Sequence, residues 1–272
     1  MSDAAPHLSL VIPAYNEESR LGPSLERVLT YFQGRSYATE VIVVSDGSQD
    51  ATGRVAEAAF AALPAGGNVR ARFIEYQPNA GKGRAVRTGV RATTGRFVAF
   101  TDADLSTPIE EVDRALRRVE DGSHLLVIGS RAVEGAAVER SQPLYRRLSA
   151  RFFNICRDNI AGLRGLKDTQ CGLKVFDGPV ARFIFARQIV DGFMFDVETM
   201  FVAQRLGLPI LELGVRWADS PDSRVKLSSG FRMVPDLLRI RFAHSSLSSA
   251  DLPPLAATSP ATHAAQAVAA SH

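Results

Sequence analysis

The feature that most constrains the fold of this chain is a regular alternation of short apolar runs and amphipathic stretches through its first half. Strands that alternate with helices form mainly parallel sheets covered on both faces, so the sequence predicts an α/β fold of that kind. The predicted strands lie at 8–14, 40–45, 69–76, 96–102 and 124–131. The helices predicted between and after them begin near 18, 50, 81 and 109. Ligands bind beyond the carboxyl ends of strands in such sheets, which is where polar residues gather in this sequence.

The second half is less regular. Helices are predicted at 141–163, 193–207 and 230–244, and a strand at 209–217. Residues 245–272 are rich in Ala, Ser and Pro and have little apolar bulk, so we expect a disordered tail after a single domain over 1–244.

Composition limits the partners. The net charge of +3 and the pI near 9.1 fit an anionic substrate or a membrane surface. No stretch interleaves clustered Lys and Arg with aromatics, so no nucleic-acid partner is expected. The two cysteines match neither a zinc nor a redox spacing, and the sequence shows no signal region and no apolar run of about 18 residues. We expect a cytoplasmic protein, peripheral to a membrane at most.

Two aspartates, Asp102 and Asp104, follow the fourth predicted strand in "TDADLS". Hard carboxylate oxygens suit Mg²⁺ or Mn²⁺, which also bind phosphate oxygens. The alternative is a strand-end turn whose polar residues cap the next helix.

Neither common nucleotide motif is present. The first strand ends in "PAYNEE" without G-x-G-x-x-G, and "NAGKGRA" lacks the P-loop spacing. Tyr15 could instead pack on a base and Asn16 and Glu17 reach a ribose, or Asn16 could cap a helix. Asp46 could accept hydrogen bonds from a base edge, and the glycines beside Lys82 would let backbone approach a phosphate.

The motifs "VIPAYNE", "DGSQDAT", "NAGKGRAVRTG", "FTDADLS", "GSR", "KDTQCGLKVF" and "GFMFDVE" occur in this order. In this arrangement the sequence resembles the family 2 inverting glycosyltransferases, and within them the dolichyl- or polyprenyl-phosphate glucosyltransferases. The resemblance runs from about residue 8 to 242. It implies a GT-A fold with a nucleotide-binding half near 8–131 and an acceptor half near 132–244.

The resemblance also implies roles for residues at matching positions. Those expected around the nucleotide-sugar are Pro13, Tyr15, Glu17, Asp46, Lys82, Gly83, Asp102, Asp104, Gln170, Arg224 and Lys226. Asp104 chiefly, with Asp102, would hold the metal. Asp196, Glu198 and Arg131 are expected at the reacting sugar. The family pattern has a second aspartate where this chain has Ser45, which leaves Asp46 alone for the base contacts.

The implied reaction moves a hexose, expected to be glucose from UDP-glucose, to a polyprenyl phosphate of the dolichyl type, with Mg²⁺ or Mn²⁺. An ionised lipid phosphate needs no base, whereas a hydroxyl acceptor would need Asp196 or Glu198 as one. A family 2 enzyme with a soluble or other hydroxyl acceptor is therefore the first alternative. A sugar nucleotidyltransferase is the second, although its glycine-rich N-terminal loop is missing.

The segment 144–163 bears on the acceptor. Its apolar residues recur at helical spacing with arginines between them, as in a helix lying on an anionic membrane surface. Arg147, Ser149 and Arg131 are candidates for the acceptor phosphate. An ordinary core-facing helix with a solvated basic face would show the same pattern.

Overall fold

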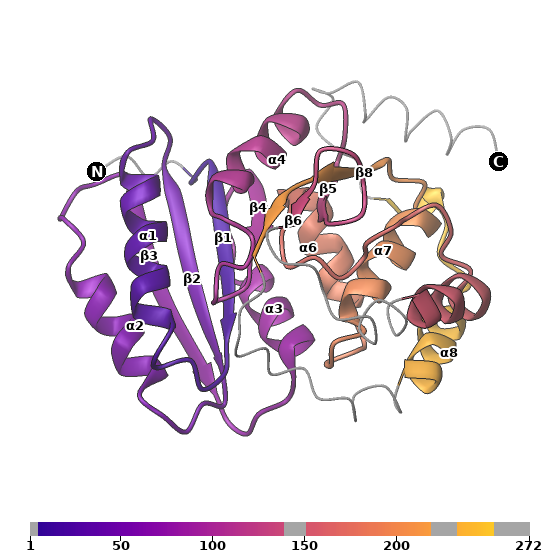
Figure 1. Ribbon diagram of the computed structural model, residues 1–272, viewed down its shortest axis with the longest axis horizontal. Helices are drawn as coiled ribbons and strands as arrows, with labels where there is room; N and C mark the ends of the chain where they lie inside the picture. The colour runs from indigo at the N-terminus through magenta and orange to yellow at the C-terminus, as the bar shows by residue number, and fades with distance from the viewer. Residues whose placement is uncertain (1–4, 139–150, 219–232, 253–272) are drawn as a thin grey trace.

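The computed structural model describes residues 5–138, 151–218 and 233–252. A seven-stranded sheet of order β3-β2-β1-β4-β7-β5-β8 runs through its centre, with helices on both sides (Figure 1). The strands are β1 Leu8–Ala14, β2 Thr39–Asp46, β3 Val69–Tyr76, β4 Phe97–Phe100, β5 Leu126–Ser130, β7 Lys174–Asp177 and β8 Ile210–Gly214. The α-helices are α1 Leu21–Gln33, α2 Thr52–Ala61, α3 Lys82–Arg91, α4 Glu110–Glu120, α6 Gly178–Arg187, α7 Phe195–Arg205 and α8 Met233–Ala243. Two short strands, β6 Ala137–Val138 and β9 Arg216–Trp217, pair in a separate sheet.

The sheet is mainly parallel, which confirms the predicted fold class. Strands β1 to β4 pair in parallel, as do β5 and β8. The exception is β7, which lies antiparallel between β4 and β5. Neither β7 nor the helix α6 after it was predicted.

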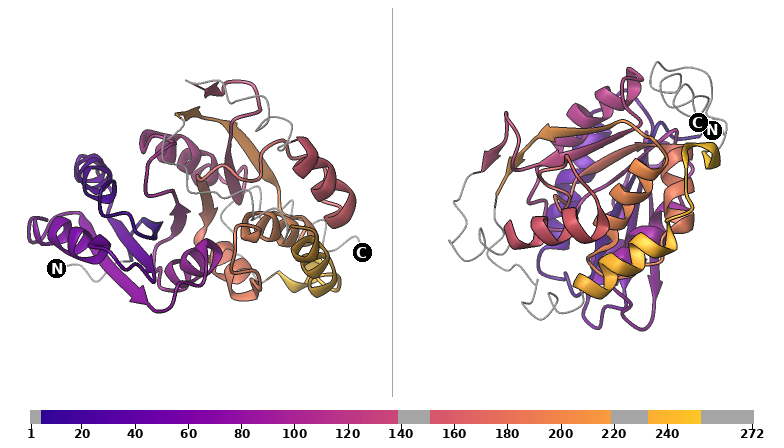
Figure 2. Two further views of the ribbon diagram at one scale, coloured as in Figure 1. Left: turned by 60° about the horizontal axis from the view of Figure 1, so that its bottom comes forward. Right: turned by 90° about the vertical axis from the view of Figure 1, so that its right-hand side faces the viewer.

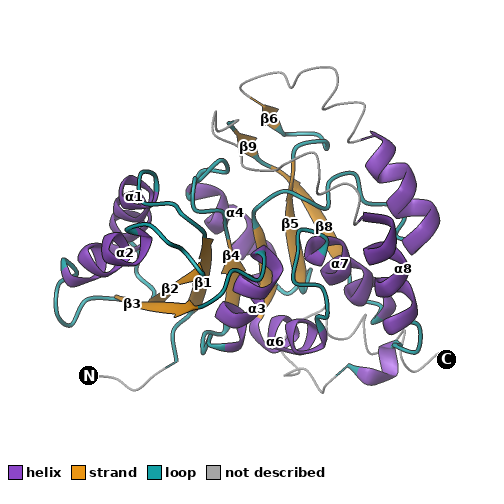
Figure 3. Ribbon diagram, turned by 90° about the horizontal axis from the view of Figure 1, so that it is seen from below, coloured by secondary structure: helices purple, strands orange, loops and turns teal. Residues whose placement is uncertain are grey.

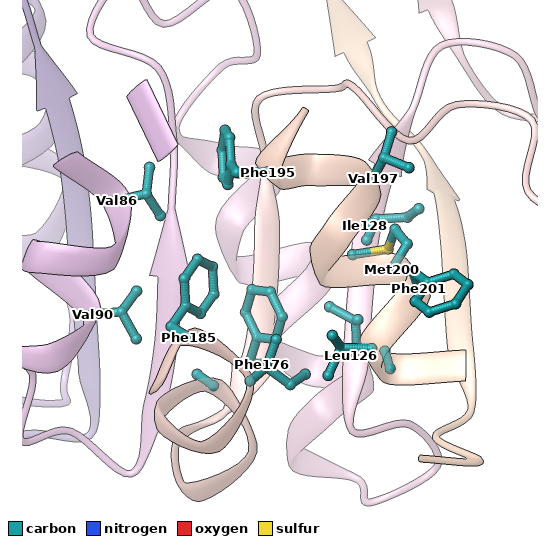
Figure 4. Close-up of a cluster of buried hydrophobic side chains, with 14 of the residues drawn as sticks. Val86, Val90, Leu126, Ile128, Phe176, Phe185, Phe195, Val197, Met200 and Phe201 are labelled. Carbon is teal, nitrogen blue, oxygen red and sulfur yellow. The ribbon is translucent and has the colours of Figure 1, made fainter. Parts of the chain in front are cut away.

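Successive residues of the central strands point to opposite faces of the sheet and build two cores. In β1, Val11 joins the core under α3, α6, α7 and α8, while Leu10 and Ile12 join the core under α1, α2 and α4. Figure 3 shows these two helical layers with the sheet between them. The aromatic centre of the first core includes Phe176 and Phe185, whose rings meet edge to face at 5.8 Å (Figure 4). Burial on both faces explains why these strands read as continuous apolar runs.

Two boundaries differ from the predictions. The first helix begins at Leu21 rather than near residue 18, because residues 18–20 form a turn in which the Arg20 N–H donates to the Glu17 carbonyl. The strand predicted at 209–217 is divided into β8 and β9, which belong to different sheets.

A further helical segment lies between β6 and β7 in the chain and packs against α8. It covers residues 151–156 and continues as a π-helix, η1 Arg157–Ala161, and the guanidinium of Arg241 in α8 donates to the Ile160 carbonyl. The start of the helix predicted at 141–163 lies outside the described residues. Figure 2 shows α8 along the outer side of α7. In the portion of the chain that the structure describes, no helix is long and apolar enough to span a bilayer.

Residues 245–252, expected to belong to a disordered tail, instead contact the domain. Leu247 and Leu252 pack against the core, and Arg205 donates to the carbonyls of Ser245 and Leu247. The remainder of that tail lies outside the described residues.

Candidate active site

Charged side chains from several elements meet at one edge of the sheet. Strands β1, β2, β4 and β5 end at this edge, and β7 begins there because it runs the opposite way. The first residues of helices α3 and α7 lie at the same edge. The edge therefore combines strand-end carboxylates with helix N-termini, which favour anions.

Asp102, just after β4, pairs with Lys82, the first residue of α3. The Lys82 Nζ lies 2.6 Å from Asp102 Oδ1. Burial alone would raise the pKa of Asp102, but the attraction of Lys82 outweighs burial and the net pKa is lowered. The same pairing outweighs the effect of burial on Lys82, whose pKa is raised. Both groups are therefore charged at neutral pH.

Gly172 makes room for Asp102. A Cβ at Gly172 would lie 2.2 Å from Asp102 Oδ2, closer than any side chain allows. Gly83 similarly abuts the chain near α7, since a Cβ there would lie 2.6 Å from the Phe195 Cβ. These two glycines let the strand-end and helix-start segments approach closely, whereas the predicted approach of backbone to a phosphate beside Lys82 stays a prediction.

Asp104 lies in the turn after β4. Its Oδ1 accepts the Ser106 N–H at 3.0 Å, and Leu105 between them has a left-handed φ of 48°. One oxygen of Asp104 thus stabilises the strand-end turn that the sequence offered as an alternative. Helix α4 begins later, without a side-chain cap.

Asp196, in the first turn of α7, faces Lys174 of β7. The Lys174 Nζ donates to Asp196 Oδ1 at 2.5 Å and to the Cys171 carbonyl at 2.9 Å. Burial raises the pKa of Asp196, and Lys174 and Lys82 oppose this rise without cancelling it. Lys82 thus influences both Asp102 and Asp196, which links the two aspartates in one charged cluster.

Glu198, two residues further along α7, points elsewhere. Its Oε1 and Oε2 accept the backbone N–H groups of Ile189 and Val190, each at 2.8 Å. His244 near the end of α8 lies 2.7 Å from the same Oε1. The Glu198 residue is 1% exposed, and both of its carboxylate oxygens are bound by protein groups. Of the two predicted acids, Asp196 is therefore the one that lies in the charged cluster with Lys82 and Asp102.

Asp46 at the end of β2 organises the loop before α3. Its two carboxylate oxygens accept four hydrogen bonds of 2.7–2.9 Å from Tyr76, Asn79, Ala80 and Gly81. Four bonds fill the acceptor capacity of a carboxylate. Asp46 therefore holds the loop that carries Lys82, and the base contact expected from sequence stays a prediction.

The loop after β1 is tied to the start of α2. The Glu17 carboxylate binds Arg20 and its N–H donates to Thr52 Oγ1 at 2.7 Å. Pro13 is buried within β1, whereas the Tyr15 side chain is 40% exposed beside the site. The Glu17 carboxylate is therefore engaged within the protein, and the ligand contact expected of Tyr15 stays a prediction.

The model of glycosyl transferase family 2 matches residues 9–190, about two thirds of the chain and all of the sheet edge up to the loop before α7. This chain belongs to glycosyl transferase family 2. Relatives named dolichyl-phosphate beta-glucosyltransferase include those of Drosophila melanogaster, 38% identical over 80% of this chain and 69% of the relative, and of Homo sapiens, 33% identical over 87% and 75%. A further such enzyme of Trichomonas vaginalis is 35% identical over 89% and 75%.

Solved structures share the GT-A fold of this glycosyltransferase. Glucosyl-3-phosphoglycerate synthase from Mycobacterium tuberculosis, solved with Mn²⁺, UDP-glucose and phosphoglyceric acid, superposes with a TM-score of 0.62 at 18% identity, covering 89% of this chain and 80% of its own. Mannosyl-3-phosphoglycerate synthase from Rubrobacter xylanophilus gives a TM-score of 0.60 at 20% identity, covering 86% and 72%.

Arg131 of the glycosyltransferase is held by a partner that sequence reasoning missed. Its guanidinium binds Asp168 through two hydrogen bonds of 2.7 and 2.9 Å and lies 5.3 Å from the Trp217 ring centroid. Burial would raise the pKa of Asp168, but Arg131 outweighs it and lowers the pKa. Gln170 is exposed nearby, and its N–H donates to the Asp168 carboxylate. Arg131 is thus fixed in orientation by a buried carboxylate.

Asp102 and Asp104 offer the type of ligand that a divalent cation prefers, but they supply only some of the ligands it needs. Carboxylate oxygens are the ligands that Mg²⁺ and Mn²⁺ prefer. Across the described ranges, however, no group of three or more His, Cys, Asp or Glu side chains is arranged to hold a metal ion. A cation at this pair would therefore complete its shell with donor phosphates and water, which is usual for Mg²⁺.

Four predicted residues lie outside the described residues: Arg147, Ser149, Arg224 and Lys226. Three partners were missed from sequence: Asp168, Lys174 and His244. The first two stand inside the quoted "KDTQCGLKVF", so the motif was a usable signal for them. His244 is the last residue of a predicted helix and belongs to none of the quoted motifs, so the sequence gave no signal for it.

Proposed function

We propose that this glycosyltransferase moves glucose from UDP-glucose to a polyprenyl phosphate, with inversion at the anomeric carbon and a divalent cation on the diphosphate. The observation that carries the proposal is the charged cluster of Lys82, Asp102 and Asp196 at one sheet edge. It stands in a chain that is 38% identical to a dolichyl-phosphate beta-glucosyltransferase over 80% of its length.

The donor would lie along the ends of β1, β2 and β4. Tyr15 is exposed for the nucleoside, and Lys82 at the start of α3 brings a positive charge and a helix N-terminus toward the diphosphate. Asp102 and Asp104 would hold a Mg²⁺ or Mn²⁺ ion, which offsets the negative charge that develops on the leaving diphosphate. Asp196 would accept hydrogen bonds from hydroxyls of the donor sugar, which its position beside Lys174 and Lys82 supports.

The transfer breaks the bond between the anomeric carbon and UDP and forms one to an oxygen of the lipid phosphate. A phosphate monoester has a second pKa of about 6, so this nucleophile is already ionised at neutral pH and no proton must be removed. Attack from the face opposite UDP inverts the anomeric configuration. Asp196 therefore orients the sugar and need not act as a base.

The acceptor's lipid chain calls for a membrane-facing surface. Large apolar side chains are exposed on two adjoining helices: Phe152 (62%) and Ile155 (53%) on the 151–156 segment, and Phe242 (71%) on α8. Arginines Arg151 and Arg239 are exposed on the same two helices. Apolar side chains bordered by basic ones suit an anionic bilayer surface.

The test is a transfer assay with the purified chain and Mn²⁺. With UDP-glucose and polyprenyl phosphate, the enzyme should release UDP and form a glucolipid. The glucolipid separates from free sugar on extraction into organic solvent. GDP-mannose and UDP-galactose serve as alternative donors, and a polyprenyl alcohol and 3-phosphoglycerate as alternative acceptors. Faster turnover with 3-phosphoglycerate or with the alcohol than with the lipid phosphate contradicts the proposed acceptor.

A further inference from the structure

Lys174 is a charged residue in the centre of the sheet. It lies in β7 with Phe100 of β4 and Ile128 of β5 as its register partners on either side, and its side chain is 0% exposed. An ionised amine in such surroundings carries a large desolvation penalty unless it is paired. Its retention in the middle of a core strand therefore needs a specific reason.

The only carboxylate that Lys174 binds within the described residues is Asp196. The Nζ donates to Asp196 Oδ1 at 2.5 Å, and the Cys171 carbonyl takes a second bond at 2.9 Å. The Phe100 ring centroid lies 5.1 Å from the same nitrogen. A rigid strand and three contacts fix the ammonium, and the ammonium in turn fixes one oxygen of the carboxylate.

The other oxygen of Asp196 is left for a ligand. Among the described residues no hydrogen bond is made to Oδ2, while Oδ1 is taken by Lys174. Asp196 sits in the first turn of α7, in the cluster with Lys82 and Asp102. By contrast, both oxygens of Glu198 on the same helix are bound by protein groups.

We infer that Lys174 is a positioning residue for sugar transfer: it holds Oδ1 of Asp196 and thereby aims Oδ2 at the donor sugar. This inference rests on the proposed function of the site. It differs from a purely structural role, in which the ion pair would only satisfy two buried charges. The groups that face Asp196 are Lys174 from β7, Lys82 from α3 and Asp102 after β4.

The experiment compares Lys174→Met, Asp196→Asn and the combined variant. Without Lys174 the effect of burial on Asp196 is less opposed, so its pKa rises and the ionised fraction falls at any given pH. Lys174→Met should lower kcat per folded molecule by about 10–100-fold, a range typical of partners that orient a working group, with a smaller change in the KM for UDP-glucose. The acid limb of its pH–rate profile should move to higher pH.

In the Asp196→Asn background, Lys174→Met should lower kcat no further, because the group that it positions is already neutral. Lys174→Met alone leaves the buried Asp196 charge without this partner, which can prevent folding. The combined variant avoids this problem because it removes both buried charges together, so it can still be assayed. A further kcat loss in that background overturns the inference.

Val175→Ala is the matched control, because Val175 is a fully buried neighbour on β7 outside the ion pair. It should lower stability and leave kcat per folded molecule and the pH profile unchanged. The inference is also overturned if Lys174→Met behaves in the same way. If the wild type transfers no sugar to lipid phosphate, the proposed function fails separately, and the comparison is made on hydrolysis of UDP-glucose.

Discussion

At the scale of single residues, the two aspartates of "TDADLS" are not equivalent. Asp102 is neutralised by Lys82 at 2.6 Å, whereas Asp104 gives one oxygen to the Ser106 N–H in its own turn. A carboxylate already paired with an ammonium gains less from binding a cation than one that is not. Asp102 is thus engaged in an ion pair with α3, and we propose Asp104 as the main metal ligand of the two.

We therefore expect Asp104→Ala to weaken the Mn²⁺ dependence of UDP binding more than Asp102→Ala does. Isothermal titration of UDP at several Mn²⁺ concentrations measures this. Asp102→Ala should instead lower affinity at every Mn²⁺ concentration, because it frees Lys82 and disturbs the start of α3. Equal loss of the Mn²⁺ response in both variants would contradict this assignment of the metal ligand.

Gly172 gives a second prediction at this scale. In Gly172→Ala the new Cβ would meet Asp102 Oδ2 at 2.2 Å, so the carboxylate must move by about an ångström. A displacement of that size at a reacting site can cost about 100-fold in rate. We expect a loss of kcat/KM of that order with nearly unchanged thermal stability, because the group displaced is a half-exposed side chain.

The control for Gly172→Ala is Gly34→Ala at the end of α1, where the nearest atom to a new Cβ is 3.5 Å away. Its activity should equal that of the wild type. Wild-type activity in Gly172→Ala would show that Asp102 tolerates displacement.

At the scale of elements, the C-terminal helix is connected to the donor site through one carboxylate. His244, directly after α8, and the backbone of Ile189 and Val190 all bind Glu198. The segment after Val190 contacts the start of α3, where the Arg84 N–H donates to the Asp191 carbonyl at 3.1 Å. Glu198 therefore secures both α8 and the segment that supports the Lys82 turn.

His244→Leu should destabilise the protein by about 1–3 kcal/mol, because it leaves a buried carboxylate oxygen short of a hydrogen bond. Urea unfolding measures the loss, and the KM for UDP-glucose should rise as the Lys82 turn loosens. His124→Gln, in a loop before β5, is the control and should change neither quantity. If the free energy of unfolding of His244→Leu equals that of the wild type, the proposed role of Glu198 in anchoring α8 is contradicted.

At the scale of the whole molecule, the apolar surface formed by the 151–156 segment and α8 predicts binding to lipid. Phe152, Ile155, Leu238 and Phe242 are each more than 40% exposed. Figure 2 shows α8 at the margin of the domain. We expect Phe152→Asp/Phe242→Asp to reduce co-flotation with vesicles containing anionic phospholipid by about tenfold or more. Each change removes an exposed aromatic side chain that would enter the bilayer and adds a negative charge that the anionic lipids repel.

The matched control for lipid binding is Val138→Asp on β6, which changes a side chain of 41% exposure on a different sheet. It should float as the wild type does. Unchanged flotation of the double variant, or equal loss in Val138→Asp, would show that this surface does not face the bilayer.

The sequence by itself determined the α/β class, the strands β1 to β5 and the sheet edge on which the charged residues lie. Strands β1, β2, β4 and β5 are buried on both faces, so each leaves a continuous apolar run that can be read locally, whereas β3 at the sheet edge shows an alternating pattern. The order of the motifs also identified the family, with Lys82, Asp102 and Asp196 among its expected site residues. The metal role of Asp104 remains a prediction.

Only the tertiary structure decided which charges meet. Lys174 and Asp196 are 22 residues apart, Arg131 and Asp168 37, and Glu198 and His244 46. β7 was missed because a lysine in "LKVF" reads locally as an exposed position. That lysine can be buried only because a helix later in the chain supplies a carboxylate, and no local pattern records such a partner.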